Sequence, residues 1–314
     1  MADNHLFKLG IVGARGYVGS ELIQLIEAHP NFELAFAASR SDAGQPVPDA
    51  PLISYIDAAP ETVAQQDVDA LILAVPDGAT EAYCNSNNAP IILDLSSDHR
   101  FDDSWTYGLS ELNSDAIRTA KHISNPGCYA TALQLLAAPI RQLTSSPIHA
   151  FGVSGYSGAG TTPSDRNNPE MLKDGVTPYK IVGHTHEREC SRHLNHAIRF
   201  SPHVAPYFRG ITLTLQAELN SPSSLDAIET LYHQQYDGHD LINVINELTP
   251  RVQDIANQPG AILGAFTLSE DKTKFAAVSV IDNLLKGAAS QAIQNLNLAL
   301  GLEMNTGLQA GALT

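Results

Sequence analysis

Residues 6–20 read LFKLGIVGARGYVGS, and this stretch decides the fold. Its first half, Leu6 to Val12, is a short apolar run typical of a buried strand, and Tyr17 to Ala28 carries apolar residues at the spacing of one helix face. A glycine-rich turn between such a strand and helix lets the backbone approach a pyrophosphate, which the helix N-terminus binds through free N–H groups. An ordinary strand-to-helix turn is the alternative. We interpret the stretch as a dinucleotide-binding loop with cofactor contacts at Gly13, Arg15, Gly16, Tyr17, Val18 and Gly19.

The next residues repeat the alternation of apolar strand and helix. Phe32 to Ala38, Leu71 to Val75 and Ile91 to Leu95 are short, mainly apolar runs separated by helical patterns. Strands of this kind predict a parallel sheet that is covered by helices on both faces. The first third of the chain therefore has the pattern of a Rossmann-type domain.

The pattern changes after Ala150. Ile211 to Leu219 alternates apolar and polar residues, which is typical of a half-buried strand in an antiparallel or mixed sheet. A helix, two strands and a last helix follow at Ser224–Tyr236, Ala261–Leu268, Phe275–Ile281 and Leu284–Leu300. We predict an α/β protein in two domains. A Rossmann-type dinucleotide-binding domain spans residues 1–127 and is completed by a C-terminal helix at 283–314, and an α+β catalytic and oligomerisation domain spans 128–282.

Composition limits the partners. The 314 residues include 34 acidic and 18 basic side chains, so the chain should be repelled by nucleic acid. Three cysteines, an odd number, favour a reducing compartment, and we expect a cytoplasmic protein. Met1 to Lys8 lacks the pattern of a signal peptide, and no run is long and apolar enough for a membrane span. We expect a homo-oligomer, either a dimer or a tetramer.

The end of the second predicted strand indicates which dinucleotide binds. It reads Ala38-Ser39-Arg40-Ser41, where an NAD enzyme usually places a carboxylate for the ribose hydroxyls. A guanidinium and a serine hydroxyl suit a 2′-phosphate instead, so Ser39 and Arg40 favour NADP. The alternative is that Arg40 is a solvated surface charge.

Cys128 is the candidate nucleophile. It follows Pro126-Gly127, a turn signal, and precedes an apolar helical run at Leu133 to Leu136. A cysteine at a helix N-terminus has a stabilised thiolate and a lowered pKa. The alternative is a buried cysteine that acts as a small hydrophobic residue.

The segment Asn125-Pro126-Gly127-Cys128-Tyr129-Ala130-Thr131 resembles the active-site motif of the N-acetyl-gamma-glutamyl-phosphate reductases, a family of arginine biosynthesis. Seven further segments resemble the same family in the same order, and together they span nearly the whole chain. They are Gly13 to Gly19; Ser39-Arg40-Ser41; Asp94 to Phe101; Tyr107 to Glu111; Ser154 to Gly160; Pro202-His203 through Arg209-Gly210-Ile211; and Asp282 to Ala289.

The resemblance implies a semialdehyde-dehydrogenase-like fold and an NADPH-dependent oxidoreductase. It also implies that Cys128 attacks the acyl phosphate of N-acetyl-glutamyl phosphate, so that phosphate leaves and a thioester forms. Hydride from NADPH then yields the semialdehyde. A covalent thioester divides one difficult step into two easier ones.

Two histidines are candidates for the acid/base. The segment Gly183 to Glu189 is similar to the family's histidine-rich stretch. It departs from the family pattern, because Thr185, Glu187 and Arg188 stand where the family usually has an arginine and Thr-Pro. We assign the role to His186, with His184 as second candidate; such a group would help to deprotonate Cys128 and would protonate the thiohemiacetal oxygen.

The same stretch has a rival interpretation as a metal site. Five possible ligands lie within thirteen residues, and three of them share a face if the segment is helical: His186, Cys190 and His193. No second ligand pair supports a metal, and the family is not a zinc family, so we expect none.

Four further polar residues are candidates for ligand contacts. Resemblance to the related aspartate-semialdehyde dehydrogenases implies that Arg100 binds the substrate phosphate, for which a guanidinium fork is well shaped; a structural ion pair is the alternative. Ser154 begins a glycine-rich loop that could shape the acyl pocket. Asn283 and Lys286 open the last helix and are assigned to the nicotinamide side of the cofactor.

Two other functions compete. An acyl-phosphate reductase such as aspartate-semialdehyde dehydrogenase would share the mechanism and differ in the acid pocket. A non-catalytic nucleotide-sensing regulator would keep the Rossmann domain, but the retained Cys128 and histidine stretch argue against it.

Overall fold

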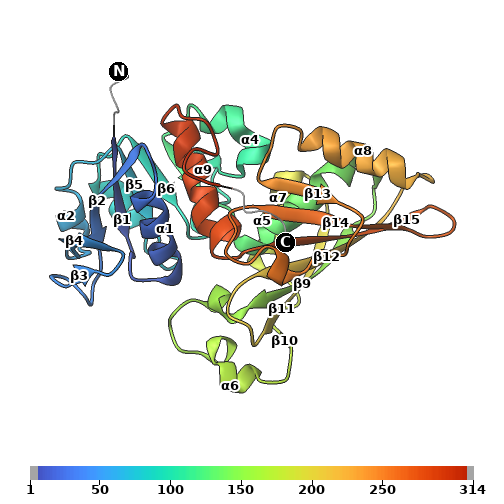
Figure 1. Ribbon diagram of the computed structural model, residues 1–314, viewed down its shortest axis with the longest axis horizontal. Coiled ribbons are helices and arrows are strands. Elements are labelled where there is room, and N and C mark those ends of the chain that lie inside the picture. The colour runs from blue at the N-terminus through green and yellow to red at the C-terminus, as the bar shows by residue number, and fades with distance from the viewer. Residues whose placement is uncertain (1–5, 310–314) are drawn as a thin grey trace. The chain divides into compact units, whose positions relative to one another are not determined.

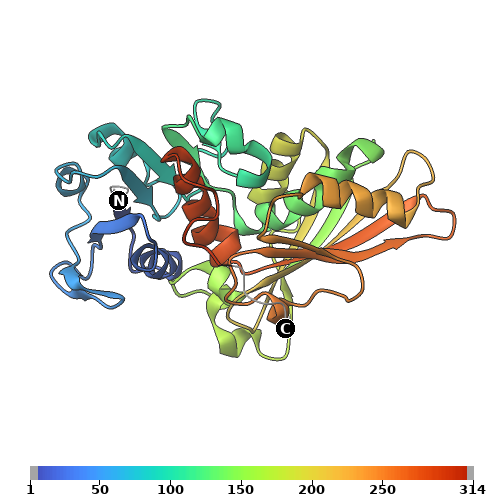
Figure 2. The same ribbon diagram turned by 45° about the horizontal axis from the view of Figure 1, so that its top comes forward.

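The computed structural model describes residues 6–309, in two compact units (Figures 1 and 2). Unit 1 contains residues 6–127 and 288–309, and unit 2 contains residues 128–287. Within residues 6–309 the chain therefore passes between them twice, at Gly127–Cys128 and at Gly287–Ala288. Residues 310–314 of the predicted C-terminal helix, and residues 1–5 of the segment considered for a signal peptide, lie outside the described part of the chain.

Unit 1 is built on a six-stranded parallel sheet of order β2-β1-β5-β6-β8-β7. Its strands are β1 (Phe7–Val12), β2 (Phe32–Ala38), β5 (Ala70–Leu73), β6 (Ile91–Asp94), β7 (Thr106–Tyr107) and β8 (His122–Ser124). A small hairpin comprises β3 (Pro46–Val47) and β4 (Ala50–Ser54). The helices are α1 (Tyr17–Glu27), α2 (Pro60–Val63), α3 (Glu81–Ser86), α4 (Ser110–Ile117) and α9 (Ser290–Ala299). A parallel sheet with short strands and connecting helices is the predicted Rossmann-type architecture, which is confirmed.

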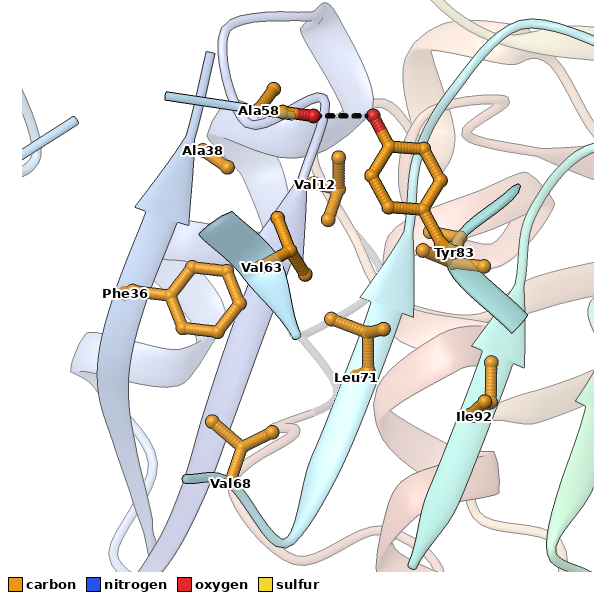
Figure 3. Packing of buried hydrophobic residues seen from close by; sticks show 10 residues of the cluster. Val12, Phe36, Ala38, Ala58, Val63, Val68, Leu71, Tyr83 and Ile92 are labelled. Carbon is orange, nitrogen blue, oxygen red and sulfur yellow. Dashed lines mark hydrogen bonds between the residues drawn. The ribbon is translucent and has the colours of Figure 1, made fainter. Parts of the chain in front are cut away.

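One core cluster of unit 1 lies over β1, β2, β5 and β6 (Figure 3). Val12, Phe36, Leu71 and Ile92 project from these strands into it. Tyr83 of α3 covers the cluster, and its hydroxyl donates a 2.7 Å hydrogen bond to the Ala58 carbonyl, so the buried phenol leaves no unsatisfied donor. The packing fixes the carboxyl ends of the strands, where the candidate cofactor loop begins.

Unit 2 is built on a seven-stranded mixed sheet of order β10-β11-β9-β12-β15-β14-β13. Its strands are β9 (Ile148–Gly155), β10 (Thr177–Pro178), β11 (Ile198–Ala205), β12 (Ile211–Glu218), β13 (Ile242–Ile245), β14 (Ala261–Leu268) and β15 (Lys274–Ile281). Its helices are α5 (Cys128–Ala137), α6 (Pro169–Leu172), α7 (Thr185–Leu194) and α8 (Leu225–Gln235). Short 3₁₀ turns lie at Ala138–Leu143, Tyr156–Ala159, Asp165–Asn167 and Val252–Asp254.

The alternation of β12 divides the two faces of this sheet. Ile211, Leu213 and Leu215 are fully buried. Helix α5 packs on β12 and β15, α7 on β11 and α5, and α8 lies along β14 (Figure 2). Gln216 and Glu218 are exposed, and Phe151 on the neighbouring β9 is 46% exposed. The strict period-two pattern thus predicted this half-buried strand correctly.

The last predicted helix differs from the expectation at its start. A π-helical turn spans Leu285–Ala289, and α9 begins only at Ser290. The Gly287 N–H donates to the carbonyl of Asp282, five residues earlier, at 2.9 Å. This wider turn is not visible in apolar periodicity, because one extra residue shifts the pattern by less than a helical turn.

Candidate active site

The glycine loop of unit 1 has the geometry of a phosphate cradle. Gly13 has a φ of +82°, and a Cβ there would lie 2.1 Å from the Ala74 carbonyl oxygen. A Cβ on Gly19 would lie 2.5 Å from the Ala14 carbonyl oxygen. Gly16 is the N-cap of α1 and supplies no side-chain cap. The turn therefore needs glycine at positions 13 and 19, and it ends at a helix N-terminus to which no side chain is bonded at the cap, which fits a pyrophosphate.

Ser39 and Arg40 lie beside this loop. Strand register pairs Val12 with Ala38, and the N–H groups of Gly13 and Ala14 both donate to the Ala38 carbonyl. Ser39 is buried and accepts a hydrogen bond from the Asp42 N–H, whereas Arg40 is exposed. The carboxyl ends of β1 and β2 thus bring Arg40 to the edge where a ribose would lie in a nucleotide bound to the loop.

Arg15, in the middle of the glycine loop, pairs with Asp42 at 3.4 Å. Its side chain is 62% exposed, so this ion pair contributes little stability and leaves the guanidinium able to move to another anion.

Arg100 is buried at the carboxyl end of β6. Its Nε donates to the Asn125 carbonyl at 2.9 Å, and one terminal nitrogen donates to the Leu95 carbonyl at 2.8 Å. These contacts give Arg100 a structural role, because it joins the end of β6 to the segment that precedes Cys128. Its contact with a substrate phosphate stays a prediction.

Cys128 is the first residue of α5, as the Pro-Gly turn predicted. The nine residues that follow it in the helix are all buried, so the helix axis is fixed in the core of unit 2. Cys128 itself is only partly buried. A partly accessible thiol at a helix N-terminus is the setting in which a thiolate is stabilised.

The other two cysteines have inert surroundings. Burial, with the carboxylates of Asp94, Asp98 and Glu81, raises the pKa of Cys84 to about 11. Burial also raises the pKa of Cys190, whose thiol lies fully inside unit 2 with Sγ 3.8 Å from the Ala130 carbonyl. Only Cys128 combines access with a stabilising helix end.

The two candidate histidines have different tasks in α7. His184 is the N-cap of the helix, and its Nδ1 accepts the N–H of His186 at 3.1 Å. The His186 ring lies 4.7 Å from the His184 ring and 6.0 Å from the ring of Tyr129, the residue next to Cys128. His184 therefore acts as a structural acceptor, and the His186 ring lies near Tyr129, which follows the candidate nucleophile in the chain. The acid/base role of His186 stays a prediction.

The metal interpretation finds no support in unit 2. The segment is helical, as that interpretation required, but the Cys190 thiol is sealed between α7 and α5. Within residues 6–309, no three side chains of His, Cys, Asp or Glu are arranged to hold a metal ion.

The remaining predicted site residues belong to unit 2 and are buried. Ser154 is the penultimate residue of β9, and its hydroxyl donates to the Gly155 carbonyl at 2.9 Å. Asn283 accepts the Gly210 N–H at 2.6 Å and donates to the Ser157 hydroxyl at 2.9 Å. Lys286 lies in the π-helical turn with no exposed surface. Their contacts with substrate or cofactor stay predictions.

Sequence reasoning missed four residues around Cys128. Tyr129 donates to the His203 carbonyl, and Tyr179 stacks edge-on against His184. Arg209 and Asp282 form an ion pair at 2.8 Å. Each lies inside a segment that resembles the family or next to the histidine stretch, but no spacing rule links them, because they come from distant parts of the chain.

Known proteins match the chain over almost its whole length. The profile "Semialdehyde dehydrogenase, NAD binding domain" matches residues 8–120, and "Semialdehyde dehydrogenase, dimerisation domain" matches residues 128–283. The chain is 49% identical to the N-acetyl-gamma-glutamyl-phosphate reductase of Stenotrophomonas maltophilia (strain R551-3), over 98% of this chain and 99% of that protein. It is 48% identical to the enzyme of the same name from Xylella fastidiosa (strain M23), over 96% and 95%.

Solved structures share the fold. Aspartate semialdehyde dehydrogenase II from Vibrio cholerae superposes with a TM-score of 0.78 at 18% identity, over 95% of this chain and 99% of that one. Aspartate semialdehyde dehydrogenase with NADP from Candida albicans superposes with a TM-score of 0.72 at 15% identity, over 93% and 98%. No helix within residues 6–309 is both long and apolar enough to cross a membrane.

The first prediction concerns the charge of His184. Burial, together with Lys180 and Arg166, lowers its pKa to about 4. In the unfolded chain a histidine has a pKa near 6.5, so between pH 7 and 5 the unfolded state gains a proton that folded His184 does not. Stability from this group is present above the unfolded pKa and is lost as the pH falls. The variant His184→Asn keeps a capping acceptor but does not titrate.

We expect the unmutated protein to lose roughly 1 kcal/mol more unfolding free energy than His184→Asn between pH 7 and pH 5, after allowance for solvent screening. Urea unfolding at the two pH values measures both losses. Equal losses in the two proteins would contradict a neutral, capping His184.

Proposed function

Because the chain belongs to the N-acetyl-gamma-glutamyl-phosphate reductase family of semialdehyde dehydrogenases, we propose that it reduces N-acetyl-L-glutamyl 5-phosphate with NADPH. The products are N-acetyl-L-glutamate 5-semialdehyde, phosphate and NADP⁺, and the reaction is a step of arginine biosynthesis. The observation that carries the proposal is Cys128 at the first position of α5, with two other cysteines whose thiols are held protonated. Of the three cysteines, only Cys128 is then suited to attack an acyl group.

Cys128 works as a covalent catalyst. Its sulfur attacks the acyl carbon, the bond from that carbon to the phosphate oxygen breaks, and phosphate leaves with the bonding electron pair. NADPH, when bound, supplies the hydride that reduces the acyl carbon. The carbon–sulfur bond then breaks, the aldehyde departs, and the thiolate is restored at the end of α5, where the helix dipole stabilises it.

His186 moves the protons. It takes the proton of the Cys128 thiol before attack and gives it to the substrate oxygen after hydride transfer. It takes this proton back as the carbon–sulfur bond breaks, so that the aldehyde carbonyl forms and the thiolate leaves. His184 fixes the start of α7 by accepting the His186 N–H, and so holds the backbone that carries the base. His184 thus has the structural role, and His186, two residues later, has the chemical role.

Cofactor binding falls to the glycine loop and the end of β2. Gly13, Gly16 and Gly19 admit the pyrophosphate to the N-terminus of α1, with Tyr17 and Val18 in its first turn. Ser39 and Arg40 bind the 2′-phosphate, and the exposed Arg15 exchanges its partner Asp42 for a cofactor phosphate. Asn283 and Lys286 are kept as candidates for the nicotinamide end.

The oligomer forms through unit 2. A dimerisation-domain profile covers residues 128–283, and the face of the sheet opposite α5 carries a half-exposed Phe151 beside exposed Gln216. We place a second copy on this face and expect a dimer or a tetramer. A catalytic thiol must stay reduced, which fits a cytoplasmic enzyme.

One assay tests the reaction. With N-acetyl-glutamate semialdehyde, the protein should turn over NADP⁺ only when phosphate is present. Phosphate must attack the thioester carbon and displace the Cys128 thiolate before the next cycle. Aspartate semialdehyde should support a much lower rate. Faster turnover of aspartate semialdehyde would contradict the proposal and would indicate an aspartate semialdehyde dehydrogenase instead.

The second prediction concerns the cofactor. The Arg40→Ala change removes the guanidinium assigned to the 2′-phosphate, so the preference for NADPH over NADH should fall by about 1–3 kcal/mol, as for a charge-assisted hydrogen bond. Titration of both cofactors into both proteins measures it. Equal affinity of the unmutated protein for NADPH and NADH would refute the assignment.

The third prediction concerns the base. We expect His186→Ala to lower kcat by roughly 10²–10⁴ while cofactor affinity is retained. His184→Asn, which preserves the helix cap, is the matched control and should keep most of the rate. If the loss follows position 184 and spares position 186, the two roles must be exchanged.

The fourth prediction concerns the nucleophile. At pH 8 a thiol with a pKa of about 11 is on the order of 0.1% ionised, so iodoacetamide should label Cys128 much faster than Cys84. Acyl phosphate without NADPH should add one acyl group to the peptide that contains Cys128. Cys128→Ser should abolish detectable turnover and retain NADPH binding. Substantial turnover by Cys128→Ser would rule out covalent catalysis.

A further inference from the structure

We propose that the turn at residues 282–287 is a brace that positions Cys128, and that Gly287 is the positioning residue where the brace meets the nucleophile. The inference rests on the proposed role of Cys128. It concerns unit 2 alone, to which all of its residues belong.

Gly287 lies directly against the base of the Cys128 side chain. A Cβ on Gly287 would be 2.7 Å from the Cβ of Cys128 and 3.2 Å from its Cα. Carbon atoms of packed side chains normally approach only to about 3.5–4.0 Å. There is therefore no room for a side chain between Gly287 and Cys128. The Gly287 backbone packs against one side of the Cys128 Cβ, which is one bond from the reacting sulfur.

The turn that carries Gly287 is held from within by Asp282. The Asp282 carbonyl accepts the Gly287 N–H at 2.9 Å, and the Asp282 carboxylate accepts the N–H of Leu284 at 2.9 Å and of Leu285 at 3.3 Å. Asp282 thus satisfies three backbone N–H donors in and just before the π-helical turn. The position of Gly287 depends on the position of Asp282.

Asp282 is in turn fixed from outside the turn. Its second carboxylate oxygen accepts the Asn257 N–H at 2.7 Å and pairs with Arg209 Nε at 2.8 Å. The Asp282 side chain has no exposed surface, and that of Arg209 is 17% exposed. Loss of one partner of such a buried pair leaves an uncompensated charge, so the pair holds one geometry.

Asn283 connects the same turn to the glycine-rich loop after β9. It accepts the Gly210 N–H at 2.6 Å and donates to Ser157 at 2.9 Å. One turn therefore contacts three parts of unit 2: Gly210 just before β12, the loop at Tyr156–Ala159, and Cys128. Asn283 makes these contacts with both its amide oxygen and its amide nitrogen, so its side chain helps to hold the turn in place.

The brace matters because the reaction needs the sulfur in one place. A misplacement of about 1 Å at a reacting group can cost on the order of 10²-fold in rate. Alkylation by a small, mobile reagent has no such requirement, since the reagent can approach from several directions. A positioning residue should therefore affect turnover much more than alkylation, whereas a merely structural residue should affect both through the folded fraction.

The test uses Gly287→Ala in the full-length enzyme. We expect kcat to fall about 10- to 100-fold, KM for the acyl phosphate to stay within about twofold, and the iodoacetamide rate at Cys128 to stay within about threefold. Gly175→Ala is the matched control, because its new Cβ would lie no closer than 3.7 Å to Leu172, and it should retain native turnover. Native kcat in Gly287→Ala would overturn the brace.

A second pair of variants covers the case in which Gly287→Ala does not fold. Arg209→Met removes the charge that holds Asp282, and should lower kcat with KM unchanged and Cys128 still alkylated. Arg209→Lys can still pair with Asp282 and should restore part of the rate. A loss of turnover matched by equal losses of alkylation and thermal stability would overturn the proposal. These results are separable from failure of the proposed function, which is decided by Cys128→Ser.

Discussion

Every polar group of Asn125 makes a hydrogen bond within unit 1. Its N–H donates to the Asp94 carbonyl at 2.7 Å, its carbonyl accepts Arg100 Nε at 2.9 Å, and its side chain contacts Asn295 of α9 at 3.0 Å and the Ala288 carbonyl at 3.4 Å. Three residues later the chain begins α5 with Cys128. Because a buried amide with unmet hydrogen bonds is costly, this set of bonds fixes the backbone at Asn125. The family-like segments around Asp94, Asn125 and Ala288 are therefore parts of one hydrogen-bonded cluster in unit 1, although they are far apart in sequence.

The same principle accounts for the unusual last helix. Most helices bury an apolar stripe, but α9 buries Gln291, Gln294, Asn295 and Asn297. Gln291 bonds to the Gly108 carbonyl and Ser110, and Asn297 bonds to the carbonyls of Met304 and Thr306. These amides satisfy backbone carbonyls that strands and helices leave without partners. A polar interior of this kind specifies position more tightly than apolar packing, since a small displacement breaks a hydrogen bond, whereas apolar contacts change gradually.

The sequence predicted the elements whose signal is local. The loop after β1, the strands Phe32–Ala38 and Ala261–Leu268, and the start of α5 at Cys128 all depend on neighbouring residues, and they lie where expected. Through resemblance to a family it also gave Cys128 as the candidate nucleophile and placed the candidate acid/base in the histidine stretch, and these roles stay predictions. It did not find Arg209, Asp282 or Gly287 as a unit, because their contacts join residues from the start of β12, the end of β15 and the start of α5. Nor could periodicity show that His184 caps a helix, since the cap depends on where Thr185 begins α7.

The glycines show the difference between local and distant constraint most clearly. Gly13 is required by its own backbone, whose φ of +82° disfavours a side chain in any surroundings, and a sequence pattern can recognise such a turn. Gly287 has no such φ, and its requirement comes from Cys128, which is distant in sequence and lies against its Cα. A helix-forming residue such as alanine would suit the local turn better than glycine does. The need for glycine at this point therefore follows from the packing of Cys128 rather than from the turn. Alanine, which local helix propensity favours here, is the residue whose Cβ would lie too close to Cys128.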